Sequence, residues 1–150
     1  MTPKFSLQNV LDIRHGKVEL LEIELGKLLA IHQETQNLLA SLHEYQANLL
    51  DQLGATQSGE IDLIEMNLLR LNILQISQHI DMLKLELKKQ ASELELKRSE
   101  LVQAKQSEET LETLKRQRYE IYLAEQVQIE SRAQDDIYIA RAFRIQHAGD

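Results

Sequence analysis

The stretch GATQSG at residues 54–59 decides the fold, because it is the single turn signal inside a helix-forming sequence that runs from about residue 7 to residue 144. Leucine and isoleucine recur on both sides of it at spacings of three and four, and no proline follows Pro3. Two long helices joined by one turn bury a narrow seam but enclose no globular core. The pattern therefore predicts an all-α fold, a long antiparallel two-helix coiled-coil hairpin with a C-terminal overhang of the second helix.

The whole chain, residues 1–150, is predicted to be a single coiled-coil domain. Ser6 is the expected N-cap of the first helix and Gly54 its expected C′ glycine, while Ser58 is a candidate cap for the second helix. Glu60 and Asp62 suit the positive N-terminus of that second helix. The predicted boundaries are helix one at about 6–53, a turn at 54–59, and helix two at about 60–146.

The predicted apolar stripe changes phase once in each helix. In helix one it runs from Leu7 to Leu28 and then slips to Ile31, Leu38, Leu42, Tyr45 and Leu49. Successive steps of three at this slip predict a stammer, which overwinds the coil locally. In helix two the stripe passes from Ile61, Ile64, Leu68 and Leu71 to a run that begins at Ile73 and ends at Leu101.

Some expected seam positions of helix two hold polar or small residues, namely Gln90, Lys97, Ala104 and Glu108. Such breaks in the apolar pattern can set the register of a coiled coil. They can equally mark the place where helix one frays away from helix two. Gly26 also has two interpretations, because it either weakens helix one or permits a close backbone approach.

The predicted arms differ in length, so helix two extends past helix one. With the turn at 54–59, Ser6 falls opposite Ser107, and the overhang runs from about Glu108 to Arg144. Three of the four tyrosines lie in this overhang together with Phe143. An isolated amphipathic helix is marginal and tends to bury its apolar face. The overhang is therefore the predicted partner-binding surface, with homo-oligomerisation through it as the alternative.

Composition and motifs exclude several classes of function. The chain has 17 basic and 24 acidic residues, a net charge of −7, which disfavours a nucleic-acid binder. No window approaches 18 uninterrupted apolar residues, so no membrane insertion is expected. The absence of cysteine excludes disulfides and thiolate metal sites. No phosphate loop, metalloprotease motif or serine elbow occurs. We expect a non-enzymatic cytoplasmic protein without metal or cofactor.

Both ends of the sequence resemble a known family. The stretch LETLKRQRYEIYLAEQ at residues 111–126, followed by Glu130, Asp135, Asp136, Ala140 and Arg144, is similar to the end of FliJ-type proteins. The stretch FSLQNVLDIR at residues 5–14 resembles the opening motif of the same family. These proteins are the central stalk of the flagellar type III export ATPase, with a counterpart in injectisomes.

The resemblance implies a function that needs no catalysis. A FliJ-type protein inserts its two-helix coiled coil into a hexameric export ATPase ring and stimulates it, and it also contacts an export gate protein and export chaperones. It works in the cytoplasm, peripheral to the membrane-embedded export apparatus. The alternatives are a coiled-coil adaptor or scaffold, or an export chaperone in another secretion or motility machine. The residues that match the C-terminal motif, and are therefore the expected ring contact, are Leu114, Lys115, Arg118, Tyr122, Glu125, Gln126 and Glu130.

Overall fold

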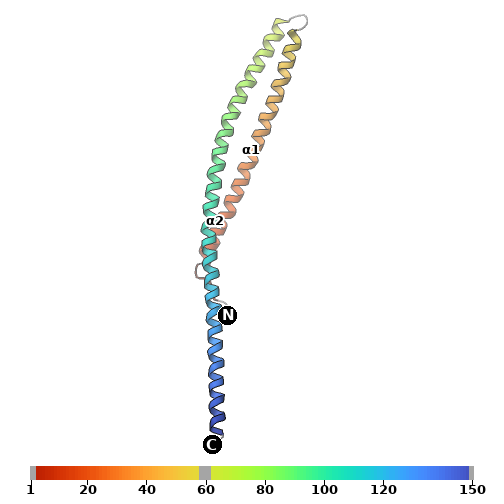
Figure 1. The fold of residues 1–150 in the computed structure, drawn as a ribbon. Helices are drawn as coiled ribbons and strands as arrows, with labels where there is room; N and C mark the ends of the chain where they lie inside the picture. Colours follow the sequence, from red (N-terminus) through yellow and green to blue (C-terminus); the bar gives the residue numbers. More distant parts are fainter. Residues whose placement is uncertain (1–2, 58–61, 149–150) are drawn as a thin grey trace. The chain divides into compact units, whose positions relative to one another are not determined.

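The structure is a computed structural model that describes residues 3–57 and 62–148. Two α-helices account for almost all of these residues, α1 (Gln8–Gln57) and α2 (Leu63–Ala148), and neither described range contains a strand (Figure 1). His32 contacts Gln90, whereas the earlier Glu24 contacts the later Lys97, so the two helices run antiparallel. The predicted all-α helical hairpin is confirmed.

The chain divides into two compact units. Unit 1 combines Met1–Lys17 with Ala104–Asp150, and unit 2 is Val18–Gln103. Each unit therefore contains one section of each helix, and the boundaries fall inside α1 and α2 rather than at their ends. The single coiled-coil domain over 1–150 stays a prediction.

The start of α1 differs from the prediction. The carbonyl of Leu7 accepts the first helical hydrogen bond from Leu11 N at 3.0 Å, which places Leu7 at the N-cap position. Ser6 is thus not the cap, and its hydroxyl accepts a hydrogen bond from Arg118 instead. A turn bonded from Gln8 N to the carbonyl of Phe5 at 3.1 Å leads the chain into the helix.

The connection between the helices lies later than predicted. α1 continues through Gly54 to Gln57, and none of the described glycines has a positive φ, so the expected C′ glycine at Gly54 is wrong. α2 begins after Asp62, whose Oδ1 accepts hydrogen bonds from Ile64 N at 3.0 Å and Glu65 N at 3.3 Å. Asp62 is therefore the N-cap of α2. Ser58, the predicted cap, and Glu60 lie outside the described residues.

In unit 2 the seam keeps one heptad pattern in each helix, with positions a and d separated by alternating steps of three and four. Every a and d side chain there is buried or half-buried. In α1 these positions hold Val18, Leu21, Leu25, Leu28, His32, Thr35, Leu39, Leu42, Gln46, Leu49, Leu53 and Thr56. In α2 they hold Met66, Leu69, Ile73, Ile76, Ile80, Leu83, Leu87, Gln90, Leu94, Lys97 and Leu101.

The predicted phase changes are therefore wrong. Ile31, Leu38 and Tyr45 are 49%, 45% and 51% exposed, while the polar His32 and Gln46 beside them take the seam positions. The same holds in α2, where the predicted seam residues Ile64, Leu68 and Leu71 are exposed and Met66 and Leu69 are half-buried. An unbroken heptad keeps one face of each helix toward the other, and this outweighs local hydrophobicity.

Four polar side chains in the seam of unit 2, those of His32, Thr35, Gln90 and Lys97, have partners across it. His32 Nδ1 lies 3.0 Å from Gln90 Oε1, and Gln90 Nε2 donates to Thr35 Oγ1 at 3.0 Å. Lys97 Nζ donates to Glu24 Oε2 at 2.9 Å and to Glu100 Oε2 at 3.3 Å. The predicted seam positions of Gln90, Lys97, Ala104 and Glu108 are confirmed, since all four are buried or half-buried.

In unit 1 the overhang of α2 starts later than predicted. Leu111 is buried, as are Leu11 and Ala104, and His15 Nδ1 lies 2.6 Å from Glu108 Oε1. The partner of Ser6 is Arg118 rather than the predicted Ser107. The reason is geometric, because the helices are antiparallel and their connection lies later in the chain than predicted. When the connection moves by one residue, the α2 residue that faces a given α1 residue changes by two.

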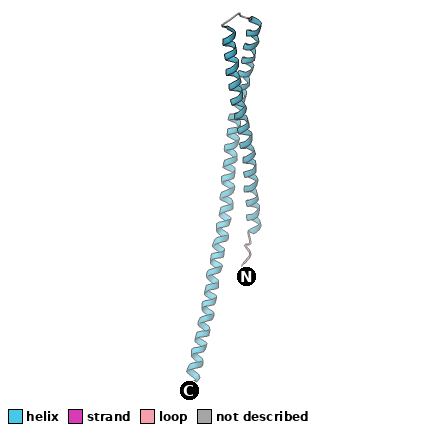
Figure 2. Cartoon of the chain, turned by 90° about the vertical axis from the view of Figure 1, so that its right-hand side faces the viewer, coloured by secondary structure: helices cyan, strands magenta, loops and turns pink. Residues whose placement is uncertain are grey.

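The true overhang is the part of α2 that follows Gln126. Every described side chain from Val127 to Ala148 is exposed, whereas Tyr122 and Gln126 are still half-buried. Figure 2 shows this part of α2 continuing past the N-terminal segment of unit 1. The long contact surface predicted from Glu108 onward is thus shorter, and about its first half, residues 108–126, packs within the chain.

Candidate functional site

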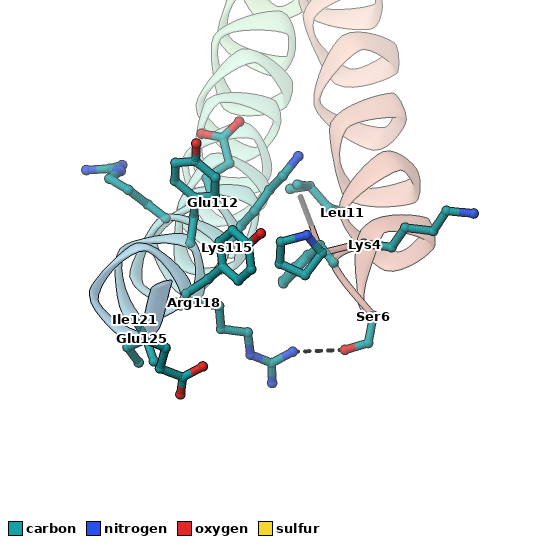
Figure 3. A pocket seen from close by; sticks show the side chains of 13 residues that line it. Lys4, Ser6, Leu11, Glu112, Lys115, Arg118, Ile121 and Glu125 are labelled. Atoms are coloured by element: carbon teal, nitrogen blue, oxygen red, sulfur yellow. Dashed lines mark hydrogen bonds between the residues drawn. The ribbon is translucent and has the colours of Figure 1, made fainter. Parts of the chain in front are cut away.

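A pocket of about 680 Å³ opens in unit 1 where the N-terminal segment meets α2 (Figure 3). Two parts of the chain that are far apart in sequence form its walls. The N-terminal wall consists of Pro3, Lys4, Phe5, Ser6 and Leu11, and the α2 wall consists of Glu112, Lys115, Arg116, Arg118, Tyr119, Ile121, Tyr122 and Glu125.

Arg118 joins the two walls. Its guanidinium carbon lies 5.4 Å from the centre of the Phe5 ring, and its Nη1 donates to Ser6 Oγ at 2.8 Å. A cation over an aromatic face at an exposed site contributes about 0.5–1 kcal/mol. The turn that bonds Gln8 N to the Phe5 carbonyl brings Phe5 and Ser6 to this position. The N-terminal segment is thus held against the basic stretch of α2.

The three cations of the α2 wall have no carboxylate partner among the described residues. Lys115 Nζ donates to the neutral Oε1 of Gln8 at 2.8 Å, and Arg118 donates to the neutral hydroxyl of Ser6. In the part of the chain that the structure describes, neither they nor Arg116 forms an ion pair. Two acidic residues, Glu112 and Glu125, also line the pocket, so its local charge remains positive.

Aromatic and aliphatic side chains supply the remainder of the lining. The rings of Tyr119 and Tyr122 lie with their centres 6.4 Å apart and their planes tilted by 31°. Leu11 is buried at the α1 side, Phe5 and Tyr122 are half-buried, and Ile121 is exposed. Figure 3 shows Leu11 and Lys115 between the two helices. The pocket therefore combines an apolar interior with a basic edge.

The structure brings four of the seven sequence-predicted contact residues to this pocket, namely Lys115, Arg118, Tyr122 and Glu125. Leu114 is half-buried and lines a separate, shallower hollow with Thr110 and Gln117. Gln126 is half-buried and Glu130 is exposed, and neither lines the pocket.

The residues predicted from the sequence do not include the N-terminal wall of the pocket, nor Glu112, Arg116, Tyr119 and Ile121 of its α2 wall. Phe5 and Ser6 were interpreted as the approach to a helix, because the predicted turn placed them opposite Ser107. A connection centred a few residues later would have placed them opposite Arg118. The heptad pattern could have shown this, because Leu11 and Leu111 both lie in the seam only when Ser6 is placed opposite Arg118.

The pocket section of α2 and the overhang both carry apolar side chains on several faces of the helix. Ile121, Tyr122 and Leu123 are consecutive, and so are Ile137, Tyr138 and Ile139. With 3.6 residues per turn, neighbours point about 100° apart, so each triplet spans more than half of the helix circumference. All three members of the second triplet are exposed. A helix that is apolar on many sides is normally surrounded by protein.

In residues 3–57 and 62–148, no group of three or more histidine, aspartate or glutamate side chains is placed to hold a metal ion. Neither α1 nor α2, over its described length, contains a segment apolar enough to cross a membrane.

Comparison with known proteins gives one match. A protein-family profile described as "Flagellar FliJ protein" matches residues 3–147 of the chain. Searches of curated proteins and of solved structures returned no match. The match spans both walls of the pocket and nearly all of the overhang.

Proposed function

The chain belongs to the flagellar FliJ protein family, and from that premise we propose that it is the central stalk of a hexameric export ATPase. Membership makes it a component of flagellar or type III protein export. In our proposal it is not an enzyme, needs no cofactor, and works in the cytoplasm at the periphery of the export apparatus. It binds the ATPase ring and stimulates ATP hydrolysis.

The exposed apolar triplet at Ile137–Ile139 carries this proposal. A partner that packs on one side of α2 would cover one stripe, but this triplet presents apolar surface in three directions. A ring that encloses the helix can cover all of them at once. Burial of apolar surface stabilises such a complex by roughly 25 cal/mol per Å² before the costs of association.

The proposed ring contact begins at the pocket and continues along the overhang. Besides the Ile137–Ile139 triplet, it includes the residues matched to the family's C-terminal motif, which are Leu114, Lys115, Arg118, Tyr122, Glu125, Gln126 and Glu130. Lys115 and Arg118 add positive charge at the start of this surface. Contacts with an export gate protein and export chaperones remain expectations from the family.

The proposed stimulation of ATP hydrolysis follows from the difference in symmetry between the single stalk and the ring of six subunits. A single helix has no sixfold symmetry, so it cannot make the same contacts with all six subunits of a ring. The subunit interface that binds the helix best is favoured to close, and closure assembles the site for ATP hydrolysis. The stalk thereby biases which interface reacts, without contributing a catalytic group.

The test is the ATPase rate of the purified ring partner with the full-length chain. We compare the wild type with Ile137→Ser/Ile139→Ser in the overhang and with Leu96→Ser, an exposed leucine of unit 2. Wild type and Leu96→Ser are expected to stimulate hydrolysis, whereas the double variant is expected to lose most of the effect. A wild-type chain that neither binds nor stimulates the ATPase disproves the stalk function.

The same variants separate the alternatives. Sedimentation that shows a homo-oligomer of the wild type and a monomer of Ile137→Ser/Ile139→Ser, without ATPase binding, favours the scaffold. Protection of an insoluble exported subunit, again without ATPase binding, favours the chaperone.

A further inference from the structure

We propose that the N-terminal segment of the chain forms half of a docking pocket that receives an acidic peptide segment of the ATPase with one apolar anchor side chain. This inference rests on the proposed function, because it names the chemistry that the ring partner presents. It adds Phe5 and Ser6 to a contact that the family motif places on α2 alone.

The interior of the pocket selects an apolar anchor. Leu11 is buried behind it, Phe5 forms one wall, and the exposed Tyr119 lines the other wall. The volume of about 680 Å³ falls within the range typical of ligand pockets. An aromatic or branched aliphatic side chain from the partner can enter and remove these surfaces from water.

The edge of the pocket selects carboxylates. The described part of the chain offers no ion-pair partner to Lys115, Arg116 or Arg118, which leaves three positive charges beside two lining glutamates. Guanidinium groups bind carboxylates through paired, charge-assisted hydrogen bonds. A free inorganic anion would satisfy the charges but leave the apolar interior empty, so an acidic peptide with an apolar residue fits better.

The N-terminal wall also positions one of these cations. Ser6 Oγ accepts a hydrogen bond from Arg118 (Figure 3), and the guanidinium carbon of Arg118 lies 5.4 Å from the centre of the Phe5 ring. An arginine held in one orientation loses less side-chain freedom when it binds a carboxylate. Figure 3 shows Lys4 pointing away from α2, so Lys4 is not expected to take part.

The first experiment measures affinity of full-length variants for the purified ATPase. Phe5→Ala and Arg116→Glu are each expected to weaken binding on the order of tenfold, as truncation of a central contact residue does. Arg98→Glu makes the same charge change on an exposed residue of unit 2 and is expected to leave affinity within about twofold. Circular dichroism confirms that each variant keeps its helices.

The second experiment identifies what enters the pocket. Tyr119→p-benzoylphenylalanine in the full-length chain is expected to cross-link to an ATPase segment that contains carboxylates and an aromatic or aliphatic residue. The same label at Leu85, exposed in unit 2, is the control and should not give this product. Cross-linking to a neutral or basic segment overturns the proposed chemistry.

The outcomes keep the two proposals apart. If the wild type does not bind the ATPase, the stalk function itself fails. If Ile137→Ser/Ile139→Ser abolishes binding while Phe5→Ala and Arg116→Glu bind like the wild type, the stalk function stands and the docking pocket is wrong.

Discussion

In unit 2, α2 packs against α1 along an unbroken heptad, whereas every described side chain of α2 after Gln126 is exposed. Leu94 and Ile129 occupy equivalent a positions, and they are 4% and 58% exposed. Two d positions in the packed part of α2 show a related contrast, because Lys97 of unit 2 pairs with Glu24 and Glu100, while Arg118 of unit 1 donates to the neutral Ser6 hydroxyl and lies over the Phe5 ring. A heptad pattern thus predicts that a helix face has a partner, but not whether that partner belongs to the same chain.

The largest expected effect tests this contrast directly. Leu94→Ala should reduce the free energy of unfolding by about 2–3 kcal/mol, because it removes a buried leucine from the seam. Ile129→Ala should change it by less than about 0.5 kcal/mol, since the side chain is exposed. Urea unfolding followed by circular dichroism measures both. Equal losses at the two positions would mean that the end of α2 is already packed, against a second copy of the chain.

A second test concerns the polar layer of unit 2. Gln90→Ala should cost about 1–2 kcal/mol, because His32 and Thr35 lose their partner across the seam. Gln90→Leu combined with His32→Leu should recover this loss, since a polar layer normally lowers the stability of a coiled coil. Sedimentation of the double variant should reveal additional oligomers. A double variant that stays less stable than the wild type would contradict a register-setting role.

The sequence was sufficient for the fold and for much of α2. Helix-forming composition and a single break predict two antiparallel helices, and the steps from Ile73 to Leu101 predict the seam of α2 through Gln90 and Lys97. These predictions succeed because apolar residues dominate the a and d positions there, so local hydrophobicity and the heptad agree.

In α1 from Ile31 onward, local hydrophobicity and the heptad indicate different seam residues. Ile31, Leu38 and Tyr45 are the more hydrophobic residues, but they lie one position before the seam, which His32 and Gln46 occupy. Only the partner helix decides this, because Gln90 provides the hydrogen bonds that make a polar seam residue acceptable.

Only one wall of the candidate pocket could be predicted from the sequence, because the position of the other depends on the partner helix. Its α2 wall has a recognisable motif in the sequence, whereas its N-terminal wall depends on the alignment of the two helices. That alignment depends on where the helices end, because α1 continues through Gly54 to Gln57 and Asp62 caps α2. A small error in the turn doubles along an antiparallel hairpin and separates Phe5 from Arg118.

A smaller effect is expected at Gly26, which the structure shows without neighbours within 4 Å of an added Cβ. The close backbone approach considered from the sequence is therefore absent. Gly26→Ala should raise the free energy of unfolding by about 0.5–1 kcal/mol through helix propensity. Thermal unfolding measures the gain, with Gly54→Ala near the end of α1 as a weaker comparison. A loss of stability at Gly26 would show that α1 is not a regular helix there.

The smallest effect concerns the paired cation of unit 2. The hydrogen bond to Glu24 chiefly, together with Glu100, raises the pKa of Lys97 above its ordinary value, although desolvation lowers it. Because the folded pKa is the higher one, the stabilisation is complete below the unfolded pKa of about 10.4 and is lost as the pH rises through the folded value. The Tm difference between the wild type and Lys97→Gln should therefore shrink in alkaline solution, and it should be smaller throughout in a Glu24→Gln background. A difference that persists at alkaline pH would mean that Lys97 acts through packing of its aliphatic stem. The contrast with Lys115, which meets a neutral amide in unit 1, would then lose its electrostatic basis.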